Sequence, residues 1–159
     1  MTANLFEVRA AEYDDESAVM EIAKAYGLVG APSNELMHRS FEEMVEYPER
    51  LLLVAAVQNS EGSPEIAGYA YAQNYGLHFR CDFTTGRLHD IFVLPKFRRY
   101  GVGRLLMDGV LTWVRERPVP LILDWQATPE AVPFYESLGL SPDYVGDQAE
   151  YPAFCFDPR

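Results

Sequence analysis

Residues 88–113 read LHDIFVLPKFRRYGVGRLLMDGVLTW, and this stretch decides the fold. The apolar run at residues 91–94 is a strand pattern that ends at Pro95, and apolar side chains recur at helical spacing after Gly101 and Gly103. A strand, a turn and a helix start in this order predict an anion site, because the first N–H groups of a helix lack partners and its dipole favours negative charge. Glycines without a Cβ would let a phosphate oxygen approach the main chain.

The turn before this helix is basic, although the chain as a whole is acidic. Four of the 13 basic residues, Lys96, Arg98, Arg99 and Arg104, lie close together, whereas the formal net charge is −11. A solvated turn could carry the same charges. Their coincidence with the glycine-rich helix start favours an anion site instead.

Length and composition bound the class of protein. A chain of 159 residues that is 48% hydrophobic and 23% charged fits one domain spanning residues 1–159. No apolar run reaches membrane-spanning length, the N-terminus lacks a signal-peptide core, and the negative net charge argues against a nucleic-acid partner. Cys81 and Cys155 form no CxxC or zinc motif. We therefore expect a cytoplasmic protein with no metal and no membrane or nucleic-acid partner.

Hydrophobic periodicity predicts a mixed α/β fold around one largely antiparallel sheet. Strand patterns cover residues 5–9, 51–57, 66–75, 88–94 and 119–125, with weaker ones near Tyr144 and at residues 151–156. Helical patterns cover residues 12–25, from Ser33 or Asn34 to Met44, 101–117 and 129–138, with Gly139 as a left-handed cap. Residues 76–86 are predicted to be a loop or the flank of a longer hairpin. The strands at 88–94 and 119–125 should be parallel, because a helix connects them.

Two familiar phosphate motifs are excluded. A dinucleotide fingerprint GxGxxG would need a third glycine where Leu106 stands, and no P-loop GxxxxGK[ST] occurs. What stands instead is Arg98-x-x-Gly101-x-Gly103, preceded by Val93-x-Pro95.

This pattern resembles the acetyl-coenzyme A loop of the GNAT superfamily of N-acetyltransferases. A second match, Ala131-x-x-Phe134-Tyr135-x-x-x-Gly139-Leu140, is similar to a downstream segment of the same family and lies at the family's spacing. The resemblance covers residues 88–140 and implies a single-domain GNAT-like α/β fold that uses acetyl-CoA as cosubstrate. It implies that the coenzyme is bound by Ile91, Phe92, Val93, Arg98, Arg99, Tyr100, Gly101, Val102, Gly103, Arg104 and Thr128. Thr128 and Arg99 depart from the family, which often has asparagine and glycine there.

Acetyl transfer to an amine sets three chemical requirements. The amine must lose a proton to a base, the carbonyl oxygen needs a hydrogen-bond donor, and the leaving thiolate needs a proton. The resemblance places the hydroxyl of Tyr135 beside the sulfur as the acid, although a purely core tyrosine is the alternative. The donor would be a backbone N–H near Phe92 or Val93, where relatives of this kind splay two parallel strands apart.

His89 and Asp90 are the candidates for the base, because charged groups in a central strand are costly unless they are paired or used. His89 could accept a proton, and Asp90 could orient a water molecule or bind a substrate ammonium. Their side chains should point to opposite faces unless a bulge intervenes. Alternatively, Asp90 pairs with Arg87 or the backbone, and His89 is merely satisfied in the core.

The spacing also resembles the diamine and thialysine (spermidine-type) acetyltransferase branch, which has Glu-Asp where this chain has His89-Asp90. The exchange keeps a base but weakens a polyamine preference. The sequence thus predicts direct acetyl transfer to a small primary amine, such as a diamine, a polyamine or a lysine-like amino acid, without a metal. A protein lysine or N-terminal acetyltransferase and a non-catalytic CoA-binding module are the alternatives. A homodimer could form through the C-terminal strand with Tyr151, Phe154 and Phe156.

Overall fold

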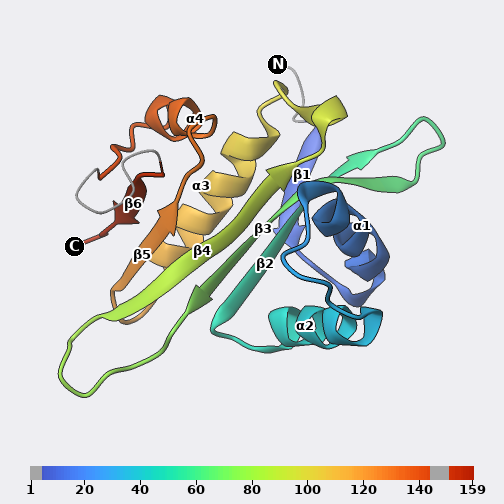
Figure 1. Cartoon of the computed structure of the whole chain (residues 1–159). Helices are drawn as coiled ribbons and strands as arrows, with labels where there is room; N and C mark the ends of the chain where they lie inside the picture. Colours follow the sequence, from blue (N-terminus) through green and yellow to red (C-terminus); the bar gives the residue numbers. More distant parts are fainter. Residues whose placement is uncertain (1–4, 144–150) are drawn as a thin grey trace.

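A computed structural model describes residues 5–143 and 151–159 (Figure 1). Within these residues six strands form one sheet in the order β1-β2-β3-β4-β5-β6, in which only β4 and β5 are parallel neighbours. The strands are β1 Phe6–Ala10, β2 Arg50–Gln58, β3 Pro64–Asn74, β4 Thr84–Val93, β5 Leu121–Gln126 and β6 Ala153–Phe156. The α-helices are α1 Glu16–Tyr26, α2 Asn34–Glu46, α3 Val102–Arg115 and α4 Val132–Ser137, and short 3-10 helices cover Tyr13–Asp15 and Pro95–Phe97. The predicted mixed α/β fold and the parallel pair are confirmed, while the weak strand near Tyr144 lies outside the described residues.

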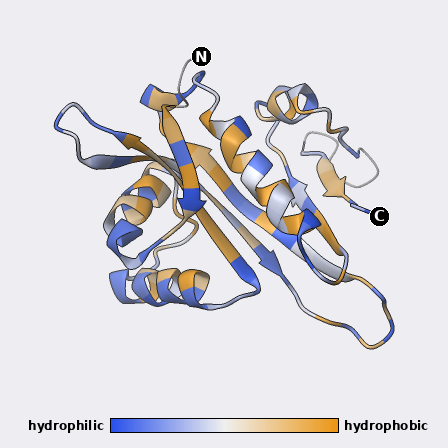
Figure 2. Ribbon diagram, turned by 180° about the vertical axis from the view of Figure 1, so that it is seen from behind, coloured by the Kyte–Doolittle hydropathy of each residue, from blue (hydrophilic) through white to orange (hydrophobic). Residues whose placement is uncertain are grey.

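Helices cover both faces of the sheet (Figure 1). Helix α3 packs on one face, where Leu106, Met107 and Val110 are fully buried against the strands. Helices α1 and α2 pack on the other face through a second core that includes Ile22 and Phe41. Figure 2 shows hydrophobic and hydrophilic residues alternating along these helices, as expected for helices with one buried side. The sheet therefore separates two hydrophobic cores.

Strand β4 begins at Thr84, four residues before the predicted strand at residues 88–94. Its first residues pair with both β3 and β5, and Gly86 lies opposite Asn74 and Leu123. A Cβ on Gly86 would lie 2.2 Å from the Gln73 carbonyl oxygen, so only glycine allows the strands to approach this closely. Here glycine continues a strand rather than ending it. Two other local predictions are confirmed: Ser33 caps α2 by accepting from Leu36 N–H at 3.1 Å, and Gly139 adopts φ +81°.

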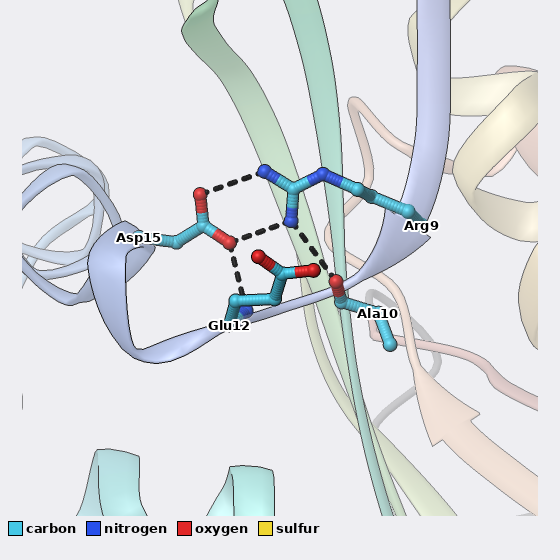
Figure 3. Close-up of polar contacts among 4 residues, drawn as sticks. All are labelled: Arg9, Ala10, Glu12 and Asp15. Carbon is cyan, nitrogen blue, oxygen red and sulfur yellow. Dashed lines mark hydrogen bonds and ion pairs between the residues drawn. The ribbon is translucent and has the colours of Figure 1, made fainter.

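An ion pair between Arg9 and Asp15 links β1 to the segment that leads into α1 (Figure 3). The guanidinium of Arg9 donates to both carboxylate oxygens of Asp15 at 2.7 and 2.9 Å, and the Glu12 N–H donates to the same carboxylate at 2.8 Å. Burial alone would raise the pKa of Asp15, but these hydrogen bonds and the charge of Arg9 outweigh it and lower the pKa. The pair therefore stabilises the fold at neutral pH, and this contribution is lost as the pH falls through the lowered pKa.

Candidate active site

The parallel strands β4 and β5 separate halfway along their length. Their pairing covers Thr84–Arg87 against Leu121–Asp124, yet β4 continues to Val93 and β5 to Gln126. Beyond Arg87, one edge of β4 therefore has no partner from β5. This opening is the splay that the family resemblance implies.

Main-chain groups of two residues face the opening. Leu94 N–H donates to the Ala67 carbonyl on β3 at 2.9 Å. Because N–H directions alternate along a strand, Phe92 N–H also faces β3, whereas the main-chain groups of Ile91 and Val93 face the opening. The Val93 carbonyl accepts from Arg98 Nε at 3.0 Å. Of the predicted donors, the N–H of Val93 is thus at the opening and that of Phe92 is not, and Ile91 joins Val93 there.

A bulge in β4 brings His89 and Asp90 to the same face of the sheet. Tyr71 lies opposite Asp90, but the next β3 residue lies opposite Leu88, so His89 is the extra residue. The His89 ring stacks on Tyr71 with centroids 4.9 Å apart, and Asp90 Oδ2 accepts from Tyr69 Oη at 3.3 Å. Since Tyr69 and Tyr71 are two residues apart on one strand, they share a face, and so do their partners.

The structure shows neither an Asp90–Arg87 ion pair nor a buried His89. Arg87 contacts Asp124 at 3.8 Å rather than Asp90, and His89 is exposed rather than packed in the core. The reason is the bulge, which turns His89 out of the alternation that would have buried it.

The surroundings shift the pKa values of His89 and Asp90 in opposite directions. Although the side chain keeps exposed surface, partial desolvation of the His89 ring lowers its pKa. The charge of Asp90 opposes this shift and those of Arg87 and Arg50 add to it, so the ring is neutral at physiological pH and can accept a proton. Burial raises the pKa of Asp90, while the hydrogen bond from Tyr69 and the charge of His89 oppose the rise. A group that can accept a proton and a carboxylate therefore lie together on the face covered by α1 and α2.

Tyr26 is a site residue that the sequence pattern did not reveal. It is the last residue of α1, and its ring lies 4.8 Å from that of Phe92, beside the opening. Burial raises its pKa, and the charge of Asp90 adds to the effect. Tyr26 in turn contributes to the raised pKa of both Tyr69 and Tyr135, which shows that it lies within electrostatic reach of both. Tyr26 lies seven residues after Val19 and four after Ile22, on the apolar face of α1, so helical periodicity alone indicates an ordinary core residue.

Tyr135 lies on α4, on the other face of the sheet. Its side chain is 4% exposed, and its ring contacts those of Trp125, Phe134 and Phe154 at centroid distances of 5.0–5.5 Å. Burial, together with Tyr26, raises its pKa well above the ordinary tyrosine value. The phenol therefore keeps its proton at neutral pH, which is the state a proton donor needs.

The basic turn leads into the exposed N-terminus of α3. Gly101 caps the helix with φ +85°, and Gly103 lies so close to the Phe134 ring that a Cβ would be 3.2 Å from it. Arg99 adopts φ 71°, the one non-glycine residue in the described ranges with a positive value, where the family often has glycine. The side chain of Val102 is buried, so this residue offers only its N–H to a ligand.

The four basic side chains of this segment divide into two groups. Lys96 pairs with Glu65, and Arg104 donates to the Ser137 carbonyl at 3.1 Å, which links α3 to α4. Arg98 lies over the Phe92 ring and, like Arg99 and Tyr100, is exposed at the helix start. An anion at this helix N-terminus would therefore meet Arg98 and Arg99 first.

Thr128 follows β5 and is exposed. Its carbonyl accepts from Ala131 N–H at 2.9 Å and begins the turn into α4. The residue thus lies on the segment that connects the opening to Tyr135.

Comparison with known proteins relates this geometry to a family. The sequence matches the acetyltransferase (GNAT) family over residues 16–140. Among solved structures, glucosamine-6-phosphate N-acetyltransferase from Arabidopsis thaliana is 21% identical, with a TM-score of 0.71 over 89% of this chain and 95% of that chain. NAA60 from the same plant, in complex with acetyl-CoA, is 13% identical, with a TM-score of 0.72 over 96% and 98% of the two chains. The ribosomal-protein-S18-alanine N-acetyltransferase from Escherichia coli is 20% identical, with a TM-score of 0.60 over 94% and 90%. No curated protein matches the sequence.

Within residues 5–143 and 151–159, no three His, Cys, Asp or Glu side chains gather as a metal site requires, and no helix is long and apolar enough to cross a bilayer.

Proposed function

The chain belongs to the GNAT family of acetyltransferases, and we propose that it moves the acetyl group of acetyl-CoA directly onto the primary amine of a small acceptor, such as a diamine, a polyamine or a lysine-like amino acid. The family membership makes it an acetyl-CoA-dependent N-acetyltransferase. The observation that carries the proposal is the opening between β4 and β5, with Tyr135 on one side and the His89–Asp90 pair on the other.

Each part of the opening supports one requirement of the transfer. The α3 N-terminus with Arg98 and Arg99 would hold the diphosphate of acetyl-CoA. The free edge of β4 would bind the pantetheine arm, and N–H groups of Ile91 or Val93 would donate to the thioester oxygen as negative charge develops there.

Protons and bonds balance without an acyl-enzyme. The pair His89–Asp90 takes one proton from the ammonium of the acceptor, directly or through water, and the freed amine forms the new C–N bond while the C–S bond breaks. Tyr135 donates its proton to the departing sulfur. The second amine proton, lost as the amide forms, restores the Tyr135 phenol through solvent, and the proton on the His89–Asp90 pair leaves to solvent as the one proton of the net reaction. Cys81 is an exposed thiol on the β3–β4 loop, so we assign it no role as a nucleophile.

The surroundings of Asp90 support a cationic acceptor. The carboxylate is flanked by Tyr69, Tyr71 and the His89 ring, and aromatic faces beside a carboxylate favour an ammonium group. The structural relatives act on different acceptors by name, an amino sugar phosphate and a ribosomal protein, and this variety leaves the acceptor to experiment.

An acceptor panel tests the proposed function. Purified protein with acetyl-CoA would be given putrescine, spermidine, lysine, glucosamine 6-phosphate and peptides with a free N-terminus or a lysine. We expect thiol release and mass-confirmed N-acetylation with one of the small amines. If only the peptides are acetylated, the acceptor is a protein and the proposal of a small amine is wrong. Coenzyme binding without turnover on any acceptor would contradict the enzyme mechanism.

A cytoplasmic location and a homodimer stay predictions from the sequence. The side chain of Phe154 is 1% exposed within its own chain, and β6 pairs with β5, so this part of the predicted dimer strand is already used. Tyr151 and Phe156 keep exposed surface and would form the contact. Sedimentation of the purified protein measures the oligomeric state.

A further inference from the structure

We infer that Tyr69 is a positioning residue for Asp90, which it holds as an ionised carboxylate facing the acceptor side of the opening. Its hydroxyl donates to Asp90 Oδ2 at 3.3 Å across the β3–β4 pair. The inference rests on the proposed function, which places Asp90 at the acceptor amine. It adds a residue that neither the motifs nor the family match identifies.

The contact follows from the regular register of β3 and β4 between Tyr69 and Tyr71. Tyr69 lies opposite Phe92 in the ladder, and Asp90 lies opposite Tyr71, so the hydrogen bond runs diagonally between neighbouring positions. Because directly opposite residues share a face, Asp90 lies on the same face as Tyr71 and Tyr69, beneath α1, and the bulge adds the His89 ring to that face. The side chain of Tyr69 is 4% exposed, so packing fixes its hydroxyl in place.

Tyr69 can act only as the donor in this pair. Burial and the nearby Asp90 charge raise its pKa far above the ordinary tyrosine value, so the phenol stays protonated at any pH at which the enzyme would work. A hydrogen bond to a carboxylate favours its charged form. Tyr69 therefore offsets part of the burial that would otherwise keep Asp90 protonated.

The groups facing Asp90 come from three elements. His89 on β4 favours the carboxylate, whereas burial disfavours it. The neutral phenols of Tyr69 and Tyr71 on β3 and of Tyr26 on α1 have raised pKa values, to which the charge of Asp90 contributes. Of these, Tyr69 is the one that donates a hydrogen bond to Asp90, so removal of its hydroxyl should act on the proton equilibrium of Asp90 directly.

The test is a pair of matched tyrosine variants. Tyr69→Phe removes the hydroxyl and keeps the ring. Tyr71→Phe removes a hydroxyl that lies 3.5 Å from Gln73 Oε1 instead, and keeps the ring that stacks on His89. Carbon NMR of the side-chain carboxyl groups follows the titration of Asp90 in the protein without acceptor, with Asp90→Asn identifying the signal.

In Tyr69→Phe we expect the Asp90 titration to move to higher pH by about one pH unit, and the Tyr71→Phe titration to stay at the wild-type position. The acid limb of kcat/KM should move upward with the NMR midpoint, because the carboxylate is needed above its pKa and is lost as the pH falls through it. A purely structural role of Tyr69 would lower kcat without moving this limb.

An unchanged NMR midpoint in Tyr69→Phe would overturn the inference, and so would a shifted midpoint with an unmoved acid limb. The proposed function fails separately, if the wild-type protein acetylates no amine, and the NMR titration needs no turnover. If Tyr69→Phe does not fold, 3-fluorotyrosine at position 69 provides a more acidic donor. That residue should then move the midpoint to lower pH, and a midpoint unchanged or moved upward would contradict the inference.

Discussion

Tyr135→Phe is expected to lower kcat by about 100-fold or more while leaving the Kd of acetyl-CoA within about twofold. The variant removes the one hydroxyl proposed to protonate the sulfur but keeps the ring packed against Trp125, Phe134 and Phe154. Stopped-flow thiol detection gives kcat, and titration calorimetry gives Kd. Because burial raises the pKa of Tyr135, the wild-type enzyme should also keep this proton donor at alkaline pH.

Two controls make this result specific. Tyr151→Phe, at a half-exposed position in the C-terminal segment, should leave kcat unchanged. A thioester whose thiol is more acidic needs less protonation, so Tyr135→Phe should lose much less rate with it. Wild-type kcat in Tyr135→Phe, or an equal loss with both thioesters, would show that Tyr135 is not the acid.

Gly101→Val is expected to raise the Kd of acetyl-CoA about tenfold or more. Gly101 adopts φ +85° where α3 begins, and a β-branched residue there is strained by about 1–3 kcal/mol, enough to turn the N–H groups of the first helical turn away from the diphosphate. A Cβ at this position would meet no atom within 4 Å, so the folded core should stay intact. Calorimetric titration with acetyl-CoA measures the effect.

Acetyl-pantetheine is the matched control ligand, since it lacks the diphosphate. Its KM should be the same in Gly101→Val and in the wild type. If both ligands weaken equally, the glycine supports the site as a whole rather than an anion at the helix start. If neither weakens, the diphosphate binds elsewhere.

The second half of the chain was predictable because its signals are local. The strand pattern at residues 91–94, the glycines before α3 and the Phe134-Tyr135 pair lie within short windows, and the structure places them at one opening. Helix caps such as Ser33 and Gly139 depend on a few neighbouring residues, and both were predicted correctly. The α/β class followed from these elements in order.

The acceptor side was less predictable because its contacts are distant in sequence. Tyr69 and Asp90 are 21 residues apart and meet only because β3 pairs with β4, and His89 joins their face through a one-residue bulge that no hydrophobic pattern encodes. Tyr26 reaches the site only because α1 ends above Phe92. Arg104 belongs to the basic cluster at the start of α3, yet its guanidinium donates to the Ser137 carbonyl on α4.

Hydrogen–deuterium exchange with and without acetyl-CoA tests the central claim most directly, namely that the free edge of β4 and the start of α3 hold the coenzyme. The account predicts slower exchange on coenzyme addition in peptides covering residues 88–94 and 100–105, with β1 unchanged. Protection confined to other segments, or none at residues 88–94 under saturating acetyl-CoA, would contradict it.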